Sequence, residues 1–151
     1  MKNNYAADIT LRIAIEEDML NVWEWRNDSV TIANSFDSVY ITMEKHDAWF
    51  MDALTNSNKV LLIGCKGEEK VGLVRFDRLS EGVSEISINV SPTFRKQGIG
   101  TIMLKKSLSW VKGRVIARIK EDNMISLSAF EKAGFRFEDR TEGIVKMVVQ
   151  A

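Results

Sequence analysis

Apolar and polar residues alternate near the start of the chain, and the pattern then changes to a helical spacing. Residues 9–15 carry an isoleucine or leucine at every second position, which predicts a strand with one buried face. Residues 16–26 place apolar side chains three and four positions apart, which predicts a helix. A second helix is predicted at residues 43–54, with Thr42 as its N-cap. Residues 29–36, between the two, are expected to form a short irregular helix or a loop.

The middle of the chain predicts three consecutive strands, at residues 60–65, 71–79 and 84–90, joined by short polar turns. Such strands form an antiparallel meander. An amphipathic helix is predicted next at residues 99–111, followed by a strand at residues 114–119. Because a helix separates this last strand from the meander, it should run parallel to the preceding strand through a right-handed crossover.

The last part of the chain predicts one more helix and two strands. The helix around residues 126–133 has a face of mostly small side chains, and the strands follow at residues 135–138 and 144–149. This order predicts an α/β fold, with a mixed, largely antiparallel sheet of about six to seven strands flanked by helices. We expect residues 1–151 to form a single domain. The apolar run at residues 145–149 would allow strand pairing between subunits of a homodimer.

Composition narrows the classes of partner. The 151 residues include 21 lysines and arginines against 21 aspartates and glutamates, so no overall basic charge favours nucleic acid or an anionic membrane. The single cysteine, Cys65, lies in an apolar segment and argues against a disulfide framework. No signal-peptide core and no membrane-spanning apolar run is found, so we expect a cytoplasmic protein. We expect no metal site.

The most informative stretch joins the strand at residues 84–90 to the helix at residues 99–111. It contains the only proline, Pro92, and then the basic, glycine-containing turn Arg95-Lys96-Gln97-Gly98-Ile99-Gly100-Thr101. Glycine permits a left-handed backbone or the close approach of a ligand, and the unpaired N–H groups of a first helical turn favour a phosphate. The pattern alone leaves open whether these glycines accommodate a ligand or only shape a tight turn.

The spacing Arg95-x-x-Gly98-x-Gly100 resembles the acyl-CoA pyrophosphate loop of the GNAT acetyltransferase superfamily, and the segment from Asn123 to Phe135 resembles a second motif of that family. The predicted element order is similar to the GNAT fold over essentially the whole chain. The resemblance implies a splayed parallel strand pair, with the pantetheine of CoA between residues 89–90 and 117–119. It also implies acetyl-CoA as the acyl donor, with contacts from Asn89, Val90, Arg95, Lys96, Gln97, Gly98, Ile99, Gly100, Thr101, Asn123, Ser126 and Phe130.

The reaction that this resemblance implies moves an acetyl group directly from the thioester to a primary amine. It requires a base for the acceptor ammonium, a hydrogen-bond donor for the oxyanion and a proton for the leaving thiolate. Glu85 shares a strand face with Ser87 and Asn89, which could face the acceptor, so Glu85 is the candidate catalytic base. The alternative is a solvent-facing glutamate. Asn123 would similarly cap the helix that follows it, whether or not it also contacts CoA.

One residue departs from the family pattern. Many GNAT enzymes have a tyrosine as general acid where this chain has Phe130, and phenylalanine cannot donate a proton. The proton must then come from Ser126, Ser128, Tyr40 or an ordered water, or the thiolate leaves unassisted. Ser126 is the candidate catalytic acid that we carry forward.

Three short motifs lie in the N-terminal third: Trp25-Arg26-Asn27-Asp28, Asn34-Ser35-Phe36 and His46-x-x-Trp49-Phe50. Together they resemble the acceptor half of a GNAT subgroup that N-acetylates nucleotide-linked amino sugars in the biosynthesis of pseudaminic and related acids. This similarity implies a UDP-amino sugar as the acceptor. Aromatic faces can stack on a base or a sugar, and an arginine can bind a phosphate. Packing between helices is the alternative, and it is favoured for Trp23, Trp49 and the lone His46. The predicted acceptor contacts are Trp25, Arg26, Asn27, Tyr40, His46, Glu85 and Ser87.

Other functions stay open at this point. A GNAT enzyme can instead acetylate a protein N-terminus or a polyamine, and a polyamine would bind to clustered carboxylates. The acidic residues near the first predicted helix could provide such a cluster, although helix starts favour acidic residues in any case. A non-catalytic acyl-CoA-binding module is the third possibility. Phe130 is its best support, because a fold alone does not establish activity.

Overall fold

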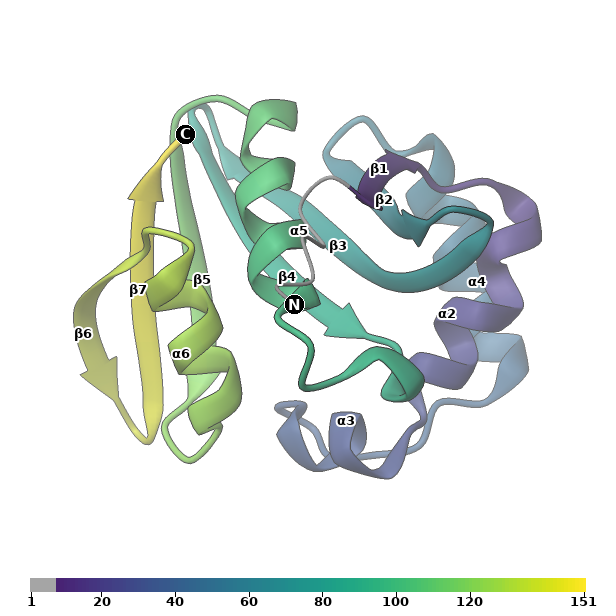
Figure 1. The fold of residues 1–151 in the computed structure, drawn as a ribbon, viewed down its shortest axis with the longest axis horizontal. Coiled ribbons are helices and arrows are strands. Elements are labelled where there is room, and N and C mark those ends of the chain that lie inside the picture. Colours follow the sequence, from purple (N-terminus) through teal and green to yellow (C-terminus); the bar gives the residue numbers. More distant parts are fainter. Residues whose placement is uncertain (1–7) are drawn as a thin grey trace.

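One mixed sheet of seven strands runs through the structure, a computed structural model that describes residues 8–151 (Figure 1). The strands lie in the order β1-β2-β3-β4-β5-β7-β6, and every neighbouring pair is antiparallel except β4 and β5. The predicted mixed, largely antiparallel α/β sheet is confirmed. The elements are β1 (Ile9–Ile13), η1 (Glu16–Asp18), α2 (Met19–Arg26), α3 (Ser29–Asn34), α4 (Met43–Thr55), β2 (Lys59–Lys66), β3 (Glu69–Ser80), β4 (Val83–Val90), η2 (Pro92–Phe94), α5 (Ile99–Ser107), η3 (Leu108–Trp110), β5 (Arg114–Lys120), α6 (Met124–Lys132), β6 (Arg136–Thr141) and β7 (Ile144–Gln150).

Helices cover both faces of the sheet, and each layer encloses its own hydrophobic core. On one face, α5 and α6 pack over a core that includes Val71 and Met103. On the other face, α2 and α4 pack over a core that includes Phe50. Side chains alternate along a strand, so the neighbouring residues Leu61 and Leu62 of β2 enter opposite cores. None of the helices within residues 8–151 is long and apolar enough to cross a membrane.

The parallel strands β4 and β5 separate along their length and leave a gap in the sheet. Their pairing ends where Glu85 lies opposite Ile116, whereas β4 continues to Val90 and β5 to Lys120. Figure 1 shows the two strands diverging toward the lower edge of the view. The predicted splayed pair is therefore confirmed. Beyond Glu85, the edge of β4 that faces the gap carries backbone groups that β5 does not pair.

A buried ion cluster joins β1 and β3 to the start of α2. Asp18 is 0% exposed. Its carboxylate accepts hydrogen bonds from the Arg12 guanidinium at 2.7 and 2.9 Å and from the Ile15 N–H at 2.9 Å, and the Lys70 ammonium lies 2.7 Å away. Burial alone would raise the pKa of Asp18, but the bonds from Arg12, Ile15 and Lys70 outweigh it and hold the pKa well below its usual range.

Two predicted helices and one predicted subunit contact differ in the structure. Residues 16–26 divide into the 3-10 turn η1 and the helix α2, and residues 99–111 divide into α5 and the 3-10 turn η3. The strand β7 lies between β5 and β6, and both of its edges are paired. Residues 145–149 therefore have no free edge to offer a second subunit, which corrects the expectation drawn from their apolar sequence.

Candidate active site

The loop between β4 and α5 places an uncapped helix start beside open space. Gly98 has a φ of +75°, in the left-handed region, and no side chain of residues 8–151 caps α5. Among these same residues, a Cβ on Gly98 would meet no atom within 4 Å. A Cβ on Gly100 would lie 3.4 Å from Val90 Cγ2, so α5 packs closely against β4. The unpaired N–H groups and the positive dipole end of α5 therefore face a space that an anion can occupy.

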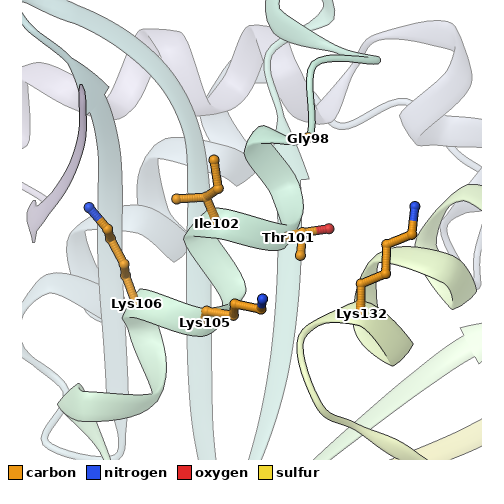
Figure 2. A pocket seen from close by; sticks show the side chains of 6 residues that line it. All are labelled: Gly98, Thr101, Ile102, Lys105, Lys106 and Lys132. Atoms are coloured by element: carbon orange, nitrogen blue, oxygen red, sulfur yellow. The ribbon is translucent and has the colours of Figure 1, made fainter. Parts of the chain in front are cut away.

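A pocket of about 410 Å³ extends from Gly98 along α5 toward α6 (Figure 2). Lys105 and Lys106 of α5 and Lys132 of α6 line it, together with Thr101. In Figure 2 the Thr101 hydroxyl points toward the side on which Lys132 lies, whereas Lys106 lies on the opposite side of α5. The pocket thus adds positive charge next to the helix start, which suits a ligand with several phosphates.

Glu85 lies where the gap between β4 and β5 opens. Its carboxylate is 24% exposed, and its Oε2 lies 3.8 Å from Arg118 Nε. The apolar residues of β4 belong to the core under α5, so Glu85, Ser87 and Asn89 share the opposite face of the strand. Ser87 is exposed and Asn89 is half-buried. The predicted common face of these three residues is therefore present, and Glu85 marks the inner end of the gap.

The guanidinium of Arg95 is bound to the start of α3. Its Nη1 donates to Asp28 Oδ2 at 2.7 Å and its Nη2 donates to Thr31 Oγ1 at 2.9 Å. The Thr31 hydroxyl in turn donates to Asn89 Oδ1 at 3.2 Å. Asp28 also caps α3 by accepting from the N–H groups of Val30 and Thr31. The side chains of Arg95 and Asn89, both expected to contact CoA, are thus engaged with α3 in this structure.

Several predicted contact residues have buried side chains. Trp25 packs in the core under α2 and α4, and His46 is only 2% exposed beside it. Ile99 and Phe130 are buried in the other core, where Phe130 meets Phe135 edge-on with ring centroids 5.0 Å apart. These side chains cannot touch a ligand in this arrangement, because core packing occupies them. The predicted acceptor contacts of Trp25 and His46 are corrected accordingly, and Ile99 has only its backbone to offer.

The segment between α2 and α4 holds the other predicted acceptor residues. The Asn27 amide bonds both backbone groups of Ile41, at 2.8 Å each, so its role is structural. Arg26 Nη2 donates to Asp37 at 3.1 Å, whereas Arg26 Nη1 is buried without a hydrogen-bond partner among the described residues. Tyr40 is exposed, and its ring packs edge-on against Trp23. Arg26 and Tyr40 therefore keep polar groups that a ligand could bind.

Asn123 and Ser126 lie at the start of α6, on the other side of the gap. Asn123 Oδ1 accepts a hydrogen bond from the Ser126 N–H at 3.3 Å, which confirms the predicted helix cap. Ser126 is half-buried in the first turn of the helix. Contact of either residue with CoA stays a prediction.

These features are those of a known family. A family model described as the acetyltransferase (GNAT) family matches residues 19–135, which include β4, the glycine loop, α5 and α6. The chain belongs to the acetyltransferase (GNAT) family. The family resemblance drawn from the two sequence motifs is confirmed, and so is the GNAT fold. The match is to the GNAT family as a whole and does not select the amino-sugar subgroup.

Individual relatives of this GNAT protein agree with the family match. The chain is 29% identical over 102 residues to YfmK of Bacillus subtilis, described as an uncharacterised N-acetyltransferase, and this match covers 62% of the chain and 65% of the relative. The chain thus matches just under two thirds of that relative's length. A domain from Methanocaldococcus jannaschii is 24% identical, with a TM-score of 0.84 over 95% of this chain and 98% of that one. Spermidine N-acetyltransferase from Vibrio cholerae, solved with CoA and spermine, has a TM-score of 0.84 at 13% identity, over 95% and 96%. At these identities the two structures show a common fold.

Some residues of the candidate site were not expected from the sequence. Lys105 lies one helical turn after Thr101, so it shares a face with the start of α5, and this spacing could have indicated it. Lys132 joins the pocket from another helix, and Asp28 and Thr31 meet Arg95 across a long stretch of chain. No sequence spacing predicts such contacts.

The buried His46, beside the core under α2 and α4, should make the stability of the fold depend on pH. Its Nε2 lies 3.0 Å from the Met19 carbonyl, so this nitrogen carries a proton and donates. Burial lowers the pKa of His46 below the usual 6.5, against the opposing effect of this hydrogen bond. Below that pH the unfolded chain binds a proton that the folded chain does not, so stability falls as the pH decreases.

We expect the free energy of unfolding of the wild type to fall more steeply from about pH 7 to about pH 5 than that of His46→Gln. The glutamine amide can still donate to Met19 but does not titrate in this range. Urea unfolding at both pH values measures the difference. Equal pH dependence in the two proteins would contradict the buried neutral imidazole.

Proposed function

We propose that the protein is an acetyl-CoA-dependent N-acetyltransferase that transfers an acetyl group directly to a primary amine, and that residues 1–151 act as one domain. The observation that carries this proposal is the start of α5. There an uncapped helix begins at left-handed Gly98, beside open space and a lysine-lined pocket. CoA carries a pyrophosphate and a further phosphate on its ribose, and this arrangement suits such a polyanion. Membership of the GNAT family supports the same donor.

The gap between β4 and β5 supports an extended donor. Beyond Glu85, β4 presents unpaired backbone groups along Ile86–Val90 to the gap, and a chain of amides can bond to them as an added strand does. We therefore propose that Asn89 and Val90 contact the pantetheine of acetyl-CoA through their backbone. The reactive thioester would then lie deep in the gap, near Glu85.

Acetyl-CoA supplies the acetyl group as a thioester, and residues of the protein accept and donate the protons that the transfer requires. The amine nitrogen forms a bond to the acetyl carbon, the carbon–sulfur bond breaks, and the thiolate leaves. We propose that Glu85 accepts one proton of the acceptor ammonium, directly or through a water. The Ser126 hydroxyl or a water gives a proton to the thiolate and regains one from the nitrogen as the amide forms. The transfer needs neither a metal ion nor a covalent enzyme intermediate, and Cys65 is buried in a core.

For the acceptor we propose a nucleotide-linked amino sugar. Three carboxylates near the gap already have cationic partners, namely Asp28 with Arg95, Asp37 with Arg26 and Glu85 with Arg118. A polyamine would have to displace these partners, which disfavours a polycationic acceptor such as spermine. The Arg26 guanidinium supports an acceptor that brings a phosphate oxygen, because its ion-pair partner Asp37 is mostly exposed and a guanidinium binds phosphate well.

The acceptor class is tested by thiol release from acetyl-CoA with three amines: a UDP-linked amino sugar, spermidine and a peptide with a free N-terminus. We expect turnover with the UDP-amino sugar at a kcat/KM at least about tenfold above that of the other two. Turnover with spermidine or the peptide alone would overturn the acceptor proposal but keep the N-acetyltransferase. Binding of acetyl-CoA without turnover on any primary amine would favour a non-catalytic module.

Replacing Glu85 with glutamine tests the proposed base. Loss of general-base catalysis typically costs about 10²–10⁴-fold, so we expect kcat of Glu85→Gln to fall at least about 100-fold at neutral pH. The affinity for acetyl-CoA should not change. Glu138→Gln removes a carboxylate of the edge strand β6 that is paired with Lys146 of β7 and Arg114 of β5, and it should retain kcat. An unaltered pH–rate profile in Glu85→Gln would show that Glu85 is not the base.

A further inference from the structure

The short helix α3 has no hydrophobic anchor. None of its residues, Ser29–Asn34, is buried, and none belongs to either hydrophobic core. Val30 is 50% exposed. A helix of six residues does not persist on its own in water, so something else must hold it in place. The position of α3 therefore depends on polar contacts.

Arg95 supplies two of these contacts. Its guanidinium is bound at once to the carboxylate of Asp28, which caps α3, and to the hydroxyl of Thr31 in the first turn. Burial raises the pKa of Asp28, but the hydrogen bond from Arg95 and the backbone bonds outweigh it and lower the pKa, so the carboxylate stays ionised. The side chains of Arg95 and Asp28 are both partly buried, which strengthens the pair relative to a fully exposed one.

The same contacts connect three parts of the active site. Arg95 belongs to the loop that leads into α5. The Thr31 hydroxyl, which accepts from Arg95, donates in turn to Asn89 near the end of β4, beside the gap. On the far side of the gap, Lys120 of β5 donates to the Ala33 carbonyl at 3.1 Å and to Ser38 Oγ at 3.2 Å. The helix α3 thus bridges the two diverging strands at the open end of the gap, where Figure 1 places it below β4.

We propose that Arg95 is a positioning residue and is not a ligand of the CoA pyrophosphate. It holds α3, and with it the acceptor side of the site, against the loop between β4 and α5. The inference rests on the proposed function. In this arrangement the pyrophosphate is left to the N–H groups at the start of α5 and to the lysines of the pocket. The segment fixed by Arg95 lies between Arg26 and Tyr40, so the acceptor site should be more sensitive to Arg95 than the donor site.

Hydrogen exchange measures the positioning without any acceptor. We expect amides of residues 28–36 to exchange faster in Arg95→Met and in Thr31→Val than in the wild type, because each variant removes bonds to α3. Arg114→Met removes a different arginine–carboxylate pair, with Glu138, and should leave these amides unchanged. Adding CoA to the wild type should leave them protected. Faster exchange on adding CoA would mean that Arg95 leaves α3 for the phosphate, and would overturn the inference.

Binding and kinetic measurements distinguish an Arg95 that positions α3 from an Arg95 that binds the CoA phosphates. We expect Arg95→Met and Thr31→Val each to raise the KM of the amine substrate by about tenfold, with a CoA Kd within about threefold of the wild type. The double variant should be no worse than Arg95→Met, since both changes break one network. A large rise in the CoA Kd for Arg95→Met, but not for Thr31→Val, would make Arg95 a phosphate ligand. If the wild type binds no CoA, the proposed function fails, while the exchange experiment still decides the role of Arg95.

Discussion

Gly98→Trp is expected to abolish acetyl-CoA binding while leaving the fold intact. Gly98 lies at the start of α5, and a Cβ there would meet no atom of the described residues within 4 Å. A side chain can therefore leave the backbone at this position, and an indole would fill the space that we assign to the pyrophosphate and cover the first N–H groups of the helix. We expect the Kd measured by calorimetry to rise at least about 100-fold. Circular dichroism checks that the fold is retained.

Gly67→Trp is the matched control for this variant. Gly67 has a φ of +61° and also meets no atom within 4 Å, but it lies in the turn between β2 and β3. Both substitutions force a bulky residue into the left-handed region at a similar cost of about 1–2 kcal/mol. Gly67→Trp should therefore lose similar stability and bind acetyl-CoA normally. Unimpaired binding by Gly98→Trp would mean that the phosphates lie elsewhere.

Asp18→Ala is expected to cause the largest loss of stability. It leaves the Arg12 guanidinium and the Lys70 ammonium without the carboxylate that lies 2.7 Å from each. Removing one partner from a fully buried ion pair typically costs about 3–5 kcal/mol. The side chains of Arg12 and Lys70 are 40% and 26% exposed, so water can partly solvate them and we expect a smaller loss of about 2–3 kcal/mol. Chemical unfolding of the wild type and the variant measures the difference. A change below about 1 kcal/mol would contradict the account of this cluster.

An exposed ion pair provides the comparison for Asp18. Asp37 is mostly exposed where it meets Arg26, so Asp37→Ala should destabilise the fold far less than Asp18→Ala. The pH dependence has a defined sign. Because the pKa of Asp18 is lowered in the folded state, its contribution is fully present above the usual value of 3.8 and is lost as the pH falls below it. Acid unfolding of the wild type should therefore be steeper than that of Asp18→Ala.

The secondary structure could be predicted well wherever one periodicity dominates. The meander from β2 to β4 and the parallel strand β5 follow from alternation and from the intervening helix, and the Thr42 cap was predicted correctly. The first helix was predicted too long, because Asp18 turns inward to Arg12 and interrupts the helix with a 3-10 turn. The spacing of apolar residues cannot show that a charged residue such as Asp18 is buried with its partners, so it could not predict this interruption.

The site was predictable only where its residues are close in sequence. The loop from Arg95 to Gly100 could be recognised, and Gly98 has the left-handed backbone for which a glycine is suited. The direction of the Arg95 side chain could not be predicted, because Asp28 lies far from it along the chain. Trp25 and His46 were assigned to the acceptor from the resemblance to a GNAT subgroup, but both are buried beside α2 and α4. Packing between helices and the sheet determines whether such a side chain is buried or exposed to a ligand, and the spacing of nearby residues does not predict this packing.

Calorimetric titration of acetyl-CoA into the wild-type protein tests the central claim most directly. The account predicts binding at a single site, with a Kd that rises as salt is added, because phosphates meet the start of α5 and the lysines beside it. It also predicts that desulfo-CoA, which keeps all the phosphates, binds with a similar dependence on salt. Absence of any binding of acetyl-CoA would contradict both the assigned donor site and the proposed transfer.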